Sequence, residues 1–210
     1  MSEQEGVIKF QLDYQRSPAP AADTVLLASW RTILQQLALL GQVPERYQGL
    51  GFGNLSQRQG AGFLITGSQT SGLAQLTEAE YAWVSSWDLA NNRLVAQGQV
   101  PPSSESLTHA AIYAQNPAIQ TVLHVHSPVI WRQATALGLP ITDPAIAYGT
   151  PAMALAVQSL LADAGQSGVF AMGGHEDGVV AYGENCQAAG ECLLGTLALA
   201  MAADSRICHS

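Results

Sequence analysis

The run of residues 119–126, IQTVLHVH, restricts the fold of this chain more than any other segment. It is short, apolar and rich in β-branched residues, and Pro117 and Pro128 bracket it, so it is predicted to be a strand. Side chains two apart on a strand point to the same face, so His124 and His126 project together. A single metal ion can use two imidazoles at this spacing, but two half-buried histidines bonded to neighbours fit it equally well.

Hydrophobic spacing, helix-cap residues, prolines and turn residues predict further elements on both sides of this strand. Helices are expected over residues 23–41, 103–115, from about 128, 151–164 and 186–203. Other strands are expected over residues 53–57, 63–66, 81–88, 93–97, 169–172 and 178–182. Strands that first cluster and then mix with helices indicate an α/β fold, a three-layer α/β/α sandwich whose central sheet is mixed and largely antiparallel.

The length of 210 residues fits one domain with its own core. No linker, repeat or low-complexity tract divides the chain after the segment SPAP at residues 17–20. Residues 22–210 are therefore predicted to form a single domain, and residues 1–21 an N-terminal extension or an edge segment.

Charge and apolar content restrict the kinds of partner that the chain can bind. The formal net charge is −8, and the eight Lys and Arg residues are spread singly, so no nucleic-acid partner is expected. The N-terminus does not resemble a signal peptide and no apolar run is judged long enough to span a membrane, so no membrane partner and a cytoplasmic location are expected. Cys186, Cys192 and Cys208 are odd in number and form no C-x-x-C, which favours reduced structural thiols.

Two more residues are candidates for chemistry. His175 follows an apolar run and small residues in FAMGGHEDG, and Glu105 falls in the first turn of the helix expected after PPSS. Taken alone, His175 also fits a simple turn histidine and Glu105 a helix-start residue. Glu176 and Asp177 stay open as metal ligands or as turn residues.

Two stretches suit an anion. GLGFGNLS and FLITGSQTSGL are rich in small residues beside strands, which lets N–H and hydroxyl groups approach anionic oxygens, although turn chemistry also explains this composition. Neither stretch has a dinucleotide or P-loop pattern. Lys9 is the only lysine and lies in a polar N-terminal stretch, which argues against catalysis through an imine. Any stabilisation of an enolate would therefore need a metal.

Five motifs occur in order along the chain: GNLS at 53–56, FLITGS at 63–68, SSE at 103–105, HVHSP at 124–128 and GH at 174–175. In this order they resemble the class II aldolase/adducin family, over nearly the whole chain from about residue 25. The resemblance implies that His124, His126 and His175 are ligands of a divalent metal, usually zinc in the aldolases, and that Glu105 is the acid/base. It also implies phosphate contacts from Asn54, Ser68, Ser103 and Ser104. Arg58 is close enough in sequence to help.

The implied activity is that of a metal-dependent carbon-carbon lyase, which acts on a small hydroxycarbonyl or sugar-phosphate substrate through a metal-stabilised enediolate. Alternatives within the family are an epimerase, a dehydratase or a non-catalytic adducin-like scaffold module. Members are typically homotetramers, so a homotetramer is expected. The sequence departs from the family pattern in two places: Tyr148 matches no donor position, so no proton donor is assigned, and GHEDG replaces the usual N-H-G.

Overall fold

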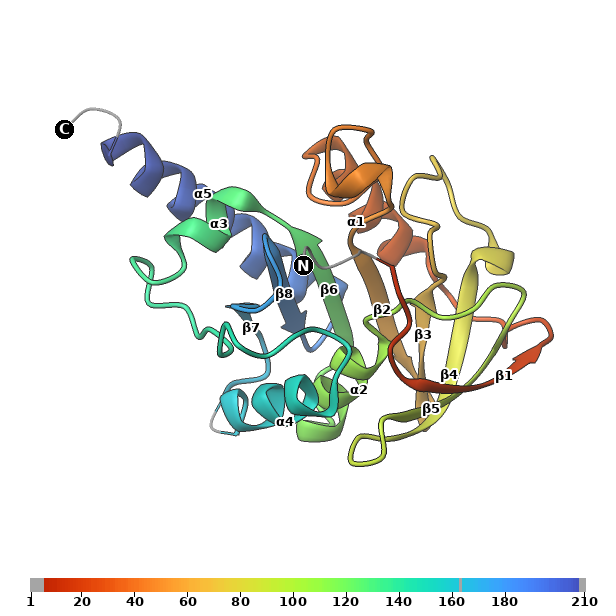
Figure 1. Ribbon diagram of the computed structural model, residues 1–210. Coiled ribbons are helices and arrows are strands. Elements are labelled where there is room, and N and C mark those ends of the chain that lie inside the picture. The colour runs from red at the N-terminus through yellow and green to blue at the C-terminus, as the bar shows by residue number, and fades with distance from the viewer. Residues whose placement is uncertain (1–5, 163, 208–210) are drawn as a thin grey trace.

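The computed structural model describes residues 6–162 and 164–207, which form a mixed eight-stranded sheet with helices (Figure 1). The strands are β1 (Gln11–Arg16), β2 (Asn54–Gln59), β3 (Gly62–Thr66), β4 (Tyr81–Asp88), β5 (Arg93–Gly98), β6 (Thr121–His126), β7 (Gly168–Ala171) and β8 (Gly178–Gly183). Their spatial order is β1-β5-β4-β3-β2-β6-β8-β7. Of the strand pairs in the described residues only β1–β5 is parallel, so the expected mixed, largely antiparallel sheet is confirmed.

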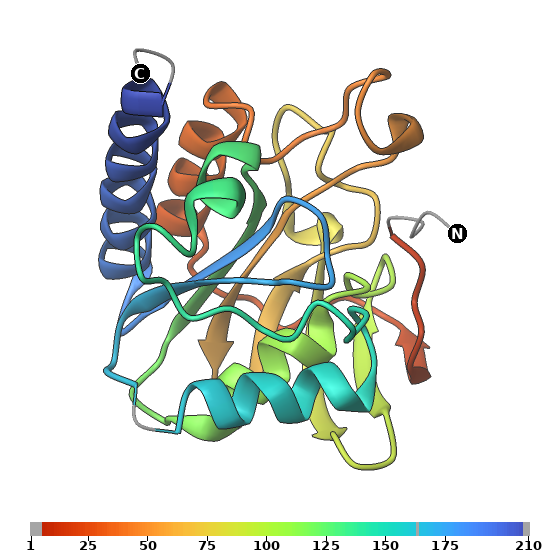
Figure 2. The same ribbon diagram turned by 60° about the vertical axis from the view of Figure 1, so that its left-hand side comes forward.

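The α-helices are α1 (Val25–Gln36), α2 (Ser106–Gln115), α3 (Pro128–Gln133), α4 (Pro151–Leu160) and α5 (Cys186–Ile207). Two buried apolar clusters show where they pack. One cluster joins α2 and α4 to the sheet, through residues that include Ala110, Met153, Ile65 and Val122. The other joins α1, α3 and α5 to the sheet, through residues that include Leu27, Ile130, Leu193, Leu64 and Leu123. Figures 1 and 2 show these two groups of helices on different sides of the strands.

The alternation along β6 sets the direction of its histidines. Val122 belongs to the cluster with α2 and α4, whereas Leu123 and Val125 belong to the other cluster. Because side chains alternate along a strand, His124 and His126 project to the same side as Val122. The two histidines thus leave the sheet on the side where α2 lies.

The expected helices and strands are present in the described residues, but two helices are shorter than expected: the first one, and the one expected over 151–164, which ends at Leu160. The first helix was expected to run to Gly41, but α1 ends at Gln36. Ala38 takes a left-handed conformation with φ of 54°, and the N–H of Leu39 donates to the carbonyl of Leu34. This is the geometry of a Schellman ending, with alanine where glycine is usual.

Residues 11–16 lie in the segment expected to be an extension or an edge segment, and they form the edge strand β1. Gln11 is opposite Arg93, and Arg16 is opposite Gly98 on β5. Much of this strand is exposed, which fits its polar sequence QLDYQR. The domain boundary near residue 22 stays a prediction.

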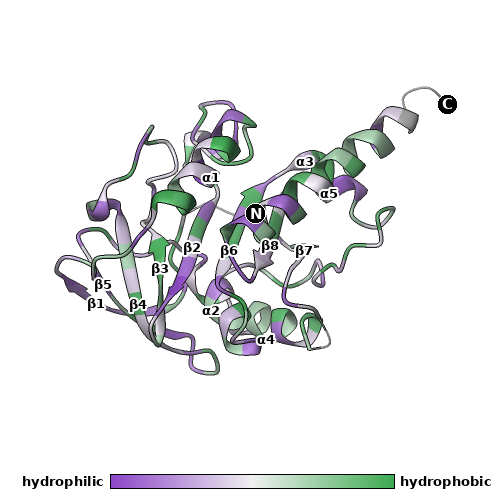
Figure 3. Cartoon of the chain, turned by 180° about the vertical axis from the view of Figure 1, so that it is seen from behind, coloured by the Kyte–Doolittle hydropathy of each residue, from purple (hydrophilic) through white to green (hydrophobic). Residues whose placement is uncertain are grey.

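The C-terminal helix differs from one sequence expectation. Residues 186–205 of α5 are long and apolar enough to cross a membrane, by length and composition alone, although no run of that length was expected. Figure 3 shows the apolar residues along this helix. One such helix is weak evidence, because core helices pass the same test, and α5 packs on the sheet here. Cys186 and Cys192 are free thiols, and Cys208 lies outside the described residues.

Candidate functional site

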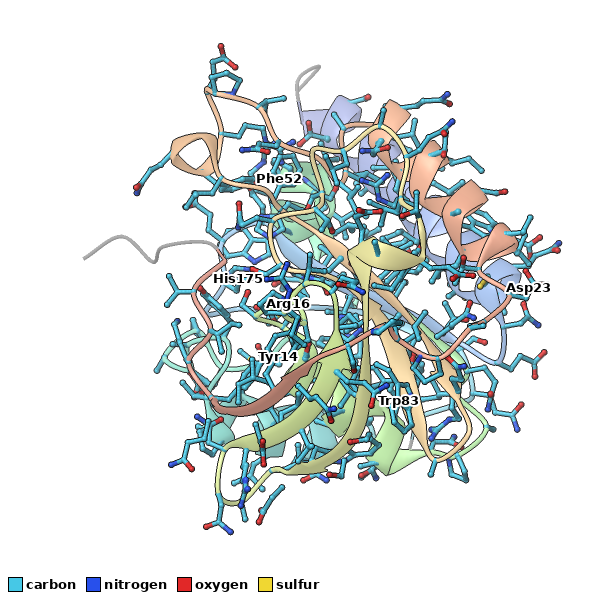
Figure 4. The ribbon with its side chains drawn as sticks, turned by 90° about the vertical axis from the view of Figure 1, so that its right-hand side faces the viewer. Tyr14, Arg16, Asp23, Phe52, Trp83 and His175 are labelled. Atoms are coloured by element: carbon cyan, nitrogen blue, oxygen red, sulfur yellow. The ribbon has the colours of Figure 1, made fainter. Side chains whose placement is uncertain are left out.

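Three histidines meet at one end of β6. His124 and His126 lie on this central strand, where His124 is opposite Asn54 of β2 and His126 is opposite Gly178 of β8. His175 comes from the turn between β7 and β8 and is labelled in Figure 4. All three side chains are at least 98 % buried. The structure therefore brings together the three residues that the sequence predicts as metal ligands.

The turn that carries His175 is closed by main-chain hydrogen bonds. The His175 N–H donates to the Met172 carbonyl, and the Gly178 N–H donates to the His175 carbonyl. Asp177 takes a left-handed conformation with φ of 61° to complete the turn. A Cβ at Gly178 would lie 2.5 Å from Cδ2 of His175, so the glycine makes room for the imidazole. The sequence GHEDG thus has a local reason to end in glycine.

The geometry of the three imidazoles fits a metal ion. One nitrogen from each ring lies within 4.8 Å of the others. A tetrahedral zinc with zinc–nitrogen bonds of about 2.0 Å needs separations of roughly 3.3 Å, so small side-chain rotations would close the site. Nδ1 of His124 is buried and has no hydrogen-bond partner among the described residues, and a bound metal ion or a hydrogen-bond acceptor would supply one.

Burial also lowers the pKa values of two of these histidines. Desolvation lowers the pKa of His124 well below its ordinary value, and the neighbouring His175 and His109 lower it further. Desolvation likewise lowers the pKa of His126, with additional contributions from His175, His124 and Arg46. Both rings are therefore neutral at physiological pH, and neutral imidazole is the form that binds a metal.

Aromatic residues enclose the outer side of His126. The rings of Tyr47 and Phe52 lie with centroids 4.5 and 5.6 Å from its ring. The Tyr47 hydroxyl donates to Oδ2 of Asp177 at 2.7 Å. Asp177, left open by the sequence as ligand or turn residue, thus accepts from a tyrosine, and Glu176 is exposed. Neither belongs to the group of possible metal ligands found in the described residues.

Glu105 is a buried carboxylate at the start of α2, with 3 % of its surface exposed. Its Oε2 accepts a hydrogen bond from the Thr108 hydroxyl at 2.8 Å, and its N–H donates to the Ser103 hydroxyl at 3.3 Å. These two contacts fix the carboxylate and the turn before it. Burial of this kind is common for acid/base residues and is costly elsewhere.

A small polar pocket contains Glu105 together with all four residues predicted to hold phosphate, Asn54, Ser68, Ser103 and Ser104. The volume of this pocket that is accessible to water is about 20 Å³. Asn54 joins the pocket to the histidines, because it is the neighbour of His124 in the sheet. The pocket wall also contains residues that the sequence analysis did not select individually, although most lie in the two glycine-rich stretches: Gly6, Gly51, Gly53, Gly67, Gln69 and Ser71.

Arg58 does not line this pocket. Its guanidinium donates to the carbonyls of Ile119, Tyr113 and Asn116 at 2.8–3.3 Å, at the end of α2 and in its connection to β6. The expectation that it helps to hold an anion was wrong, because β2 carries residue 58 away from the end of the strand where Asn54 lies. The pocket lining contains no Lys or Arg.

His109 is a fourth buried histidine, outside the group of three. Its Nδ1 lies 2.7 Å from the Ser56 hydroxyl, which is also 2.8 Å from the Tyr113 hydroxyl. Burial lowers the pKa of His109 from 6.5 to about 3, so the ring is neutral in the folded protein. In the unfolded chain the same ring takes up a proton near pH 6.5.

This shift predicts acid destabilisation. The contribution of neutral His109 to stability is complete above pH 6.5 and is lost as the pH falls from 6.5 towards 3, by about 1.4 kcal/mol per pH unit for one proton. Urea unfolding of metal-free protein between pH 7.5 and 5 measures this slope. The variant His109→Gln should have a slope smaller by about one proton than the native protein. Equal slopes would mean that His109 is protonated in the fold.

Comparison with known proteins adds three findings. A family model described as Class II Aldolase and Adducin N-terminal domain matches residues 44–200. A search of curated proteins finds no match. Several solved structures match in fold although their sequence identity is low.

L-fuculose-1-phosphate aldolase from Thermus thermophilus is 22% identical, with a TM-score of 0.59 over 88% of this chain and 92% of that chain. A sugar-phosphate aldolase from Thermotoga maritima is 13% identical, with a TM-score of 0.63 over 83% and 90%. YgbL from Escherichia coli, for which aldolase, epimerase and decarboxylase are offered as candidate activities, is 21% identical, with a TM-score of 0.60 over 83% and 84%. At these identities the similarity concerns the fold.

Proposed function

Because this chain belongs to the Class II Aldolase and Adducin N-terminal domain family, we propose that it is a metal-dependent lyase of the class II aldolase type. The substrate is a small hydroxycarbonyl compound with a polar or anionic end, such as a sugar phosphate. The cofactor is a divalent metal, zinc in the first instance, because three imidazoles and an open position suit catalytic zinc. His124, His126 and His175 hold it.

One observation carries this proposal: three buried, mutually close histidines lie next to a polar pocket that contains a buried carboxylate. Burying four ionisable side chains is costly unless they have partners, so a cluster of this kind is characteristic of a working site. A scaffold module has no need for such a cluster. The geometry therefore favours an enzyme over the adducin-like alternative.

The roles follow from the positions. When bound, the metal supplies a Lewis acid that polarises the substrate carbonyl. Glu105 moves the proton: in the aldol direction it takes one from the carbon beside the carbonyl, and in cleavage from the hydroxyl on the bond that breaks. The Thr108 hydroxyl keeps the carboxylate oriented for this transfer. Asn54, Ser68, Ser103 and Ser104 bind the polar end of the substrate with neutral donors.

An epimerase or a dehydratase is the alternative, because both reactions also begin by moving a proton beside a polarised carbonyl. Tyr148 does not decide between them. Its ring lies 4.7 Å from the ring of His175 and is fully buried, which makes it part of the wall that supports the histidine. The choice of reaction is therefore a question for the substrate assay.

Several further points belong to the proposal. The three-layer α/β/α arrangement is supported by the two apolar clusters that pack α2 and α4, and α1, α3 and α5, against the sheet. A homotetramer remains an expectation from the family, and a cytoplasmic location remains an expectation from the sequence. Size-exclusion chromatography with light scattering measures the first directly.

A substrate panel with metal removal tests the proposed activity. Ketose phosphates, pentulose phosphates and methylthioribulose phosphate are offered to native protein, to protein stripped with EDTA, and to stripped protein given zinc, manganese or cobalt. We expect turnover of at least one compound, loss of that turnover on stripping, and recovery with one of the metals. Absence of metal-dependent turnover across the panel would count against every enzyme assignment made above.

A further inference from the structure

The loop that closes one side of the polar pocket is held from behind by a buried arginine. Residues 67–73 follow β3 and contribute Ser68, Gln69 and Ser71 to the pocket wall. Arg31 lies on the buried face of α1, four residues after Leu27 and three before Leu34. Only 3 % of its surface is exposed. A charged residue in an apolar helix stripe needs a specific reason.

The guanidinium of Arg31 is directed at the main chain of this loop. Its Nη2 lies 3.0 Å from the carbonyl oxygen of Thr70, 3.0 Å from that of Ser71 and 2.7 Å from that of Leu73. Its Nη1 donates to Oε1 of Gln35, whose Nε2 donates to the carbonyls of Ser71 and Leu73 at 2.9 Å. Two side chains of α1 thus hold the same three-carbonyl segment.

Among the described residues, no carboxylate neutralises the charge of Arg31. Within residues 6–162 and 164–207 no Asp or Glu forms an ion pair with it. Guanidinium remains protonated in proteins, so the positive charge persists behind the loop. Because the surroundings are buried, this charge is screened less than one at the surface.

The carbonyls that face Arg31 also set the direction of the N–H groups in the same peptide units. A trans peptide has its carbonyl and its N–H on opposite sides, so the Thr70 and Ser71 carbonyls that face Arg31 turn the N–H groups of Ser71 and Gly72 away from α1. Neither N–H has a main-chain acceptor in the described part of the chain. Consecutive N–H groups directed away from a cation form an arrangement that attracts anions.

The same loop is tied to the opposite wall of the pocket. The Ser71 hydroxyl donates to the Gly53 carbonyl at 2.9 Å, and the Gly51 N–H donates to Oε1 of Gln69 at 3.0 Å. Gly53 immediately precedes Asn54, the pocket residue beside His124. A shift of the loop would therefore move both walls.

We propose that Arg31 is a positioning residue for the anionic end of the substrate. It fixes the 67–73 loop through three carbonyls and places a positive charge behind a pocket whose lining has no Lys or Arg. The ligand is an oxyanion, specifically the phosphate group of a phosphate monoester. This inference rests on the proposed function in one respect, that the pocket receives the polar end of the substrate.

The test measures binding of inorganic phosphate by calorimetry, with metal-loaded protein and with EDTA-stripped protein. The variants are Arg31→Met, Arg31→Lys and Gln35→Leu. Arg58→Met is the matched control, because Arg58 also donates to three main-chain carbonyls but lies away from the pocket. Melting temperature and metal content are measured for every variant.

We expect the affinity for phosphate to fall by about tenfold or more in Arg31→Met and by a few-fold in Gln35→Leu. The affinity of Arg58→Met should stay within about twofold of that of native protein. Arg31→Lys should lie between native and Arg31→Met, because it keeps the charge but loses the planar fork. With a substrate identified, KM for the phosphorylated compound should rise in Arg31→Lys more than kcat falls. Metal content should be unchanged. These readouts separate positioning from a general loss of stability.

If native protein binds phosphate and Arg31→Met and Gln35→Leu bind it with the same affinity, this inference is overturned. The proposed enzyme function is not affected by that result. If Arg31→Met fails to fold, Arg31→Lys and Gln35→Leu decide the question alone. Absence of phosphate binding by native protein would overturn both the inference and the anion pocket. Metal-dependent turnover measured on non-phosphorylated compounds would show whether the lyase assignment survives that result.

Discussion

Replacing Glu105 by glutamine is expected to lower kcat by about 10²- to 10⁴-fold, the usual contribution of a general acid or base. The substitution keeps the size of the side chain and its capacity to accept from the Thr108 hydroxyl, but it removes the group that takes up the proton. Metal content should remain that of native protein, because the three histidines are untouched. Steady-state kinetics on the substrate found in the panel measure the effect.

The matched control is Glu191→Gln, an exposed carboxylate on α5 that accepts from the Gln187 side chain at 2.8 Å. It should keep native kcat and native metal content. A Glu105→Gln variant with kcat within about threefold of native would remove Glu105 from the role of acid/base, since general catalysis contributes far more. Loss of metal in the Glu105→Gln variant would instead indicate that Glu105 binds the metal.

The double variant His124→Ala plus His126→Ala should lose metal binding and activity together. It removes two of the three proposed ligands, and the remaining imidazole of His175 cannot hold a divalent ion against water. We expect the metal content to fall from about one equivalent per chain to background, measured on protein purified without an affinity tag. His109→Gln is the control, because His109 is also buried but stands outside the ligand group.

Circular dichroism should show that the double variant is folded, because removing metal ligands leaves both apolar clusters in place. A folded variant that keeps its metal would contradict the assignment of these histidines. A variant that keeps activity without metal would contradict the proposed chemistry as a whole.

Local pattern predicts much of this fold. The alternation in residues 119–126 correctly placed His124 and His126 on one face of a strand. Helical spacing placed α1, a serine cap placed α2, and Pro151 in the first turn placed α4.

Residues 11–16 carry a local strand signal that was missed, because the apolar side chains of Leu12 and Tyr14 alternate with polar ones and pack on the core. The partner of β1 could not be predicted, because it pairs with β5, a strand far along the chain at residues 93–98, and local periodicity does not identify a distant partner.

For the site, as for the fold, the sequence predicts one part but not the rest. The order of short motifs, through the family resemblance, pointed to His175 and Glu105, but spacing alone could not bring residues so far apart in the chain into one site. Sequence proximity to Asn54 suggested Arg58 as the pocket cation, whereas β2 carries it away and Arg31 approaches from α1. The position of Arg31 between Leu27 and Leu34 on the buried stripe was the available signal. A charge on an apolar helix face indicates a buried polar contact but not the identity of its partner.

X-ray absorption spectroscopy of the metal-loaded protein counts the ligands of the bound ion and so tests the three-histidine site. We expect three imidazole nitrogens at about 2.0–2.1 Å from zinc, with any further ligand an oxygen. The spectrum should lose this imidazole signal in the His124→Ala plus His126→Ala variant. A sulfur ligand at about 2.3 Å, or a shell of oxygens with no imidazole, would contradict a metal site built from His124, His126 and His175.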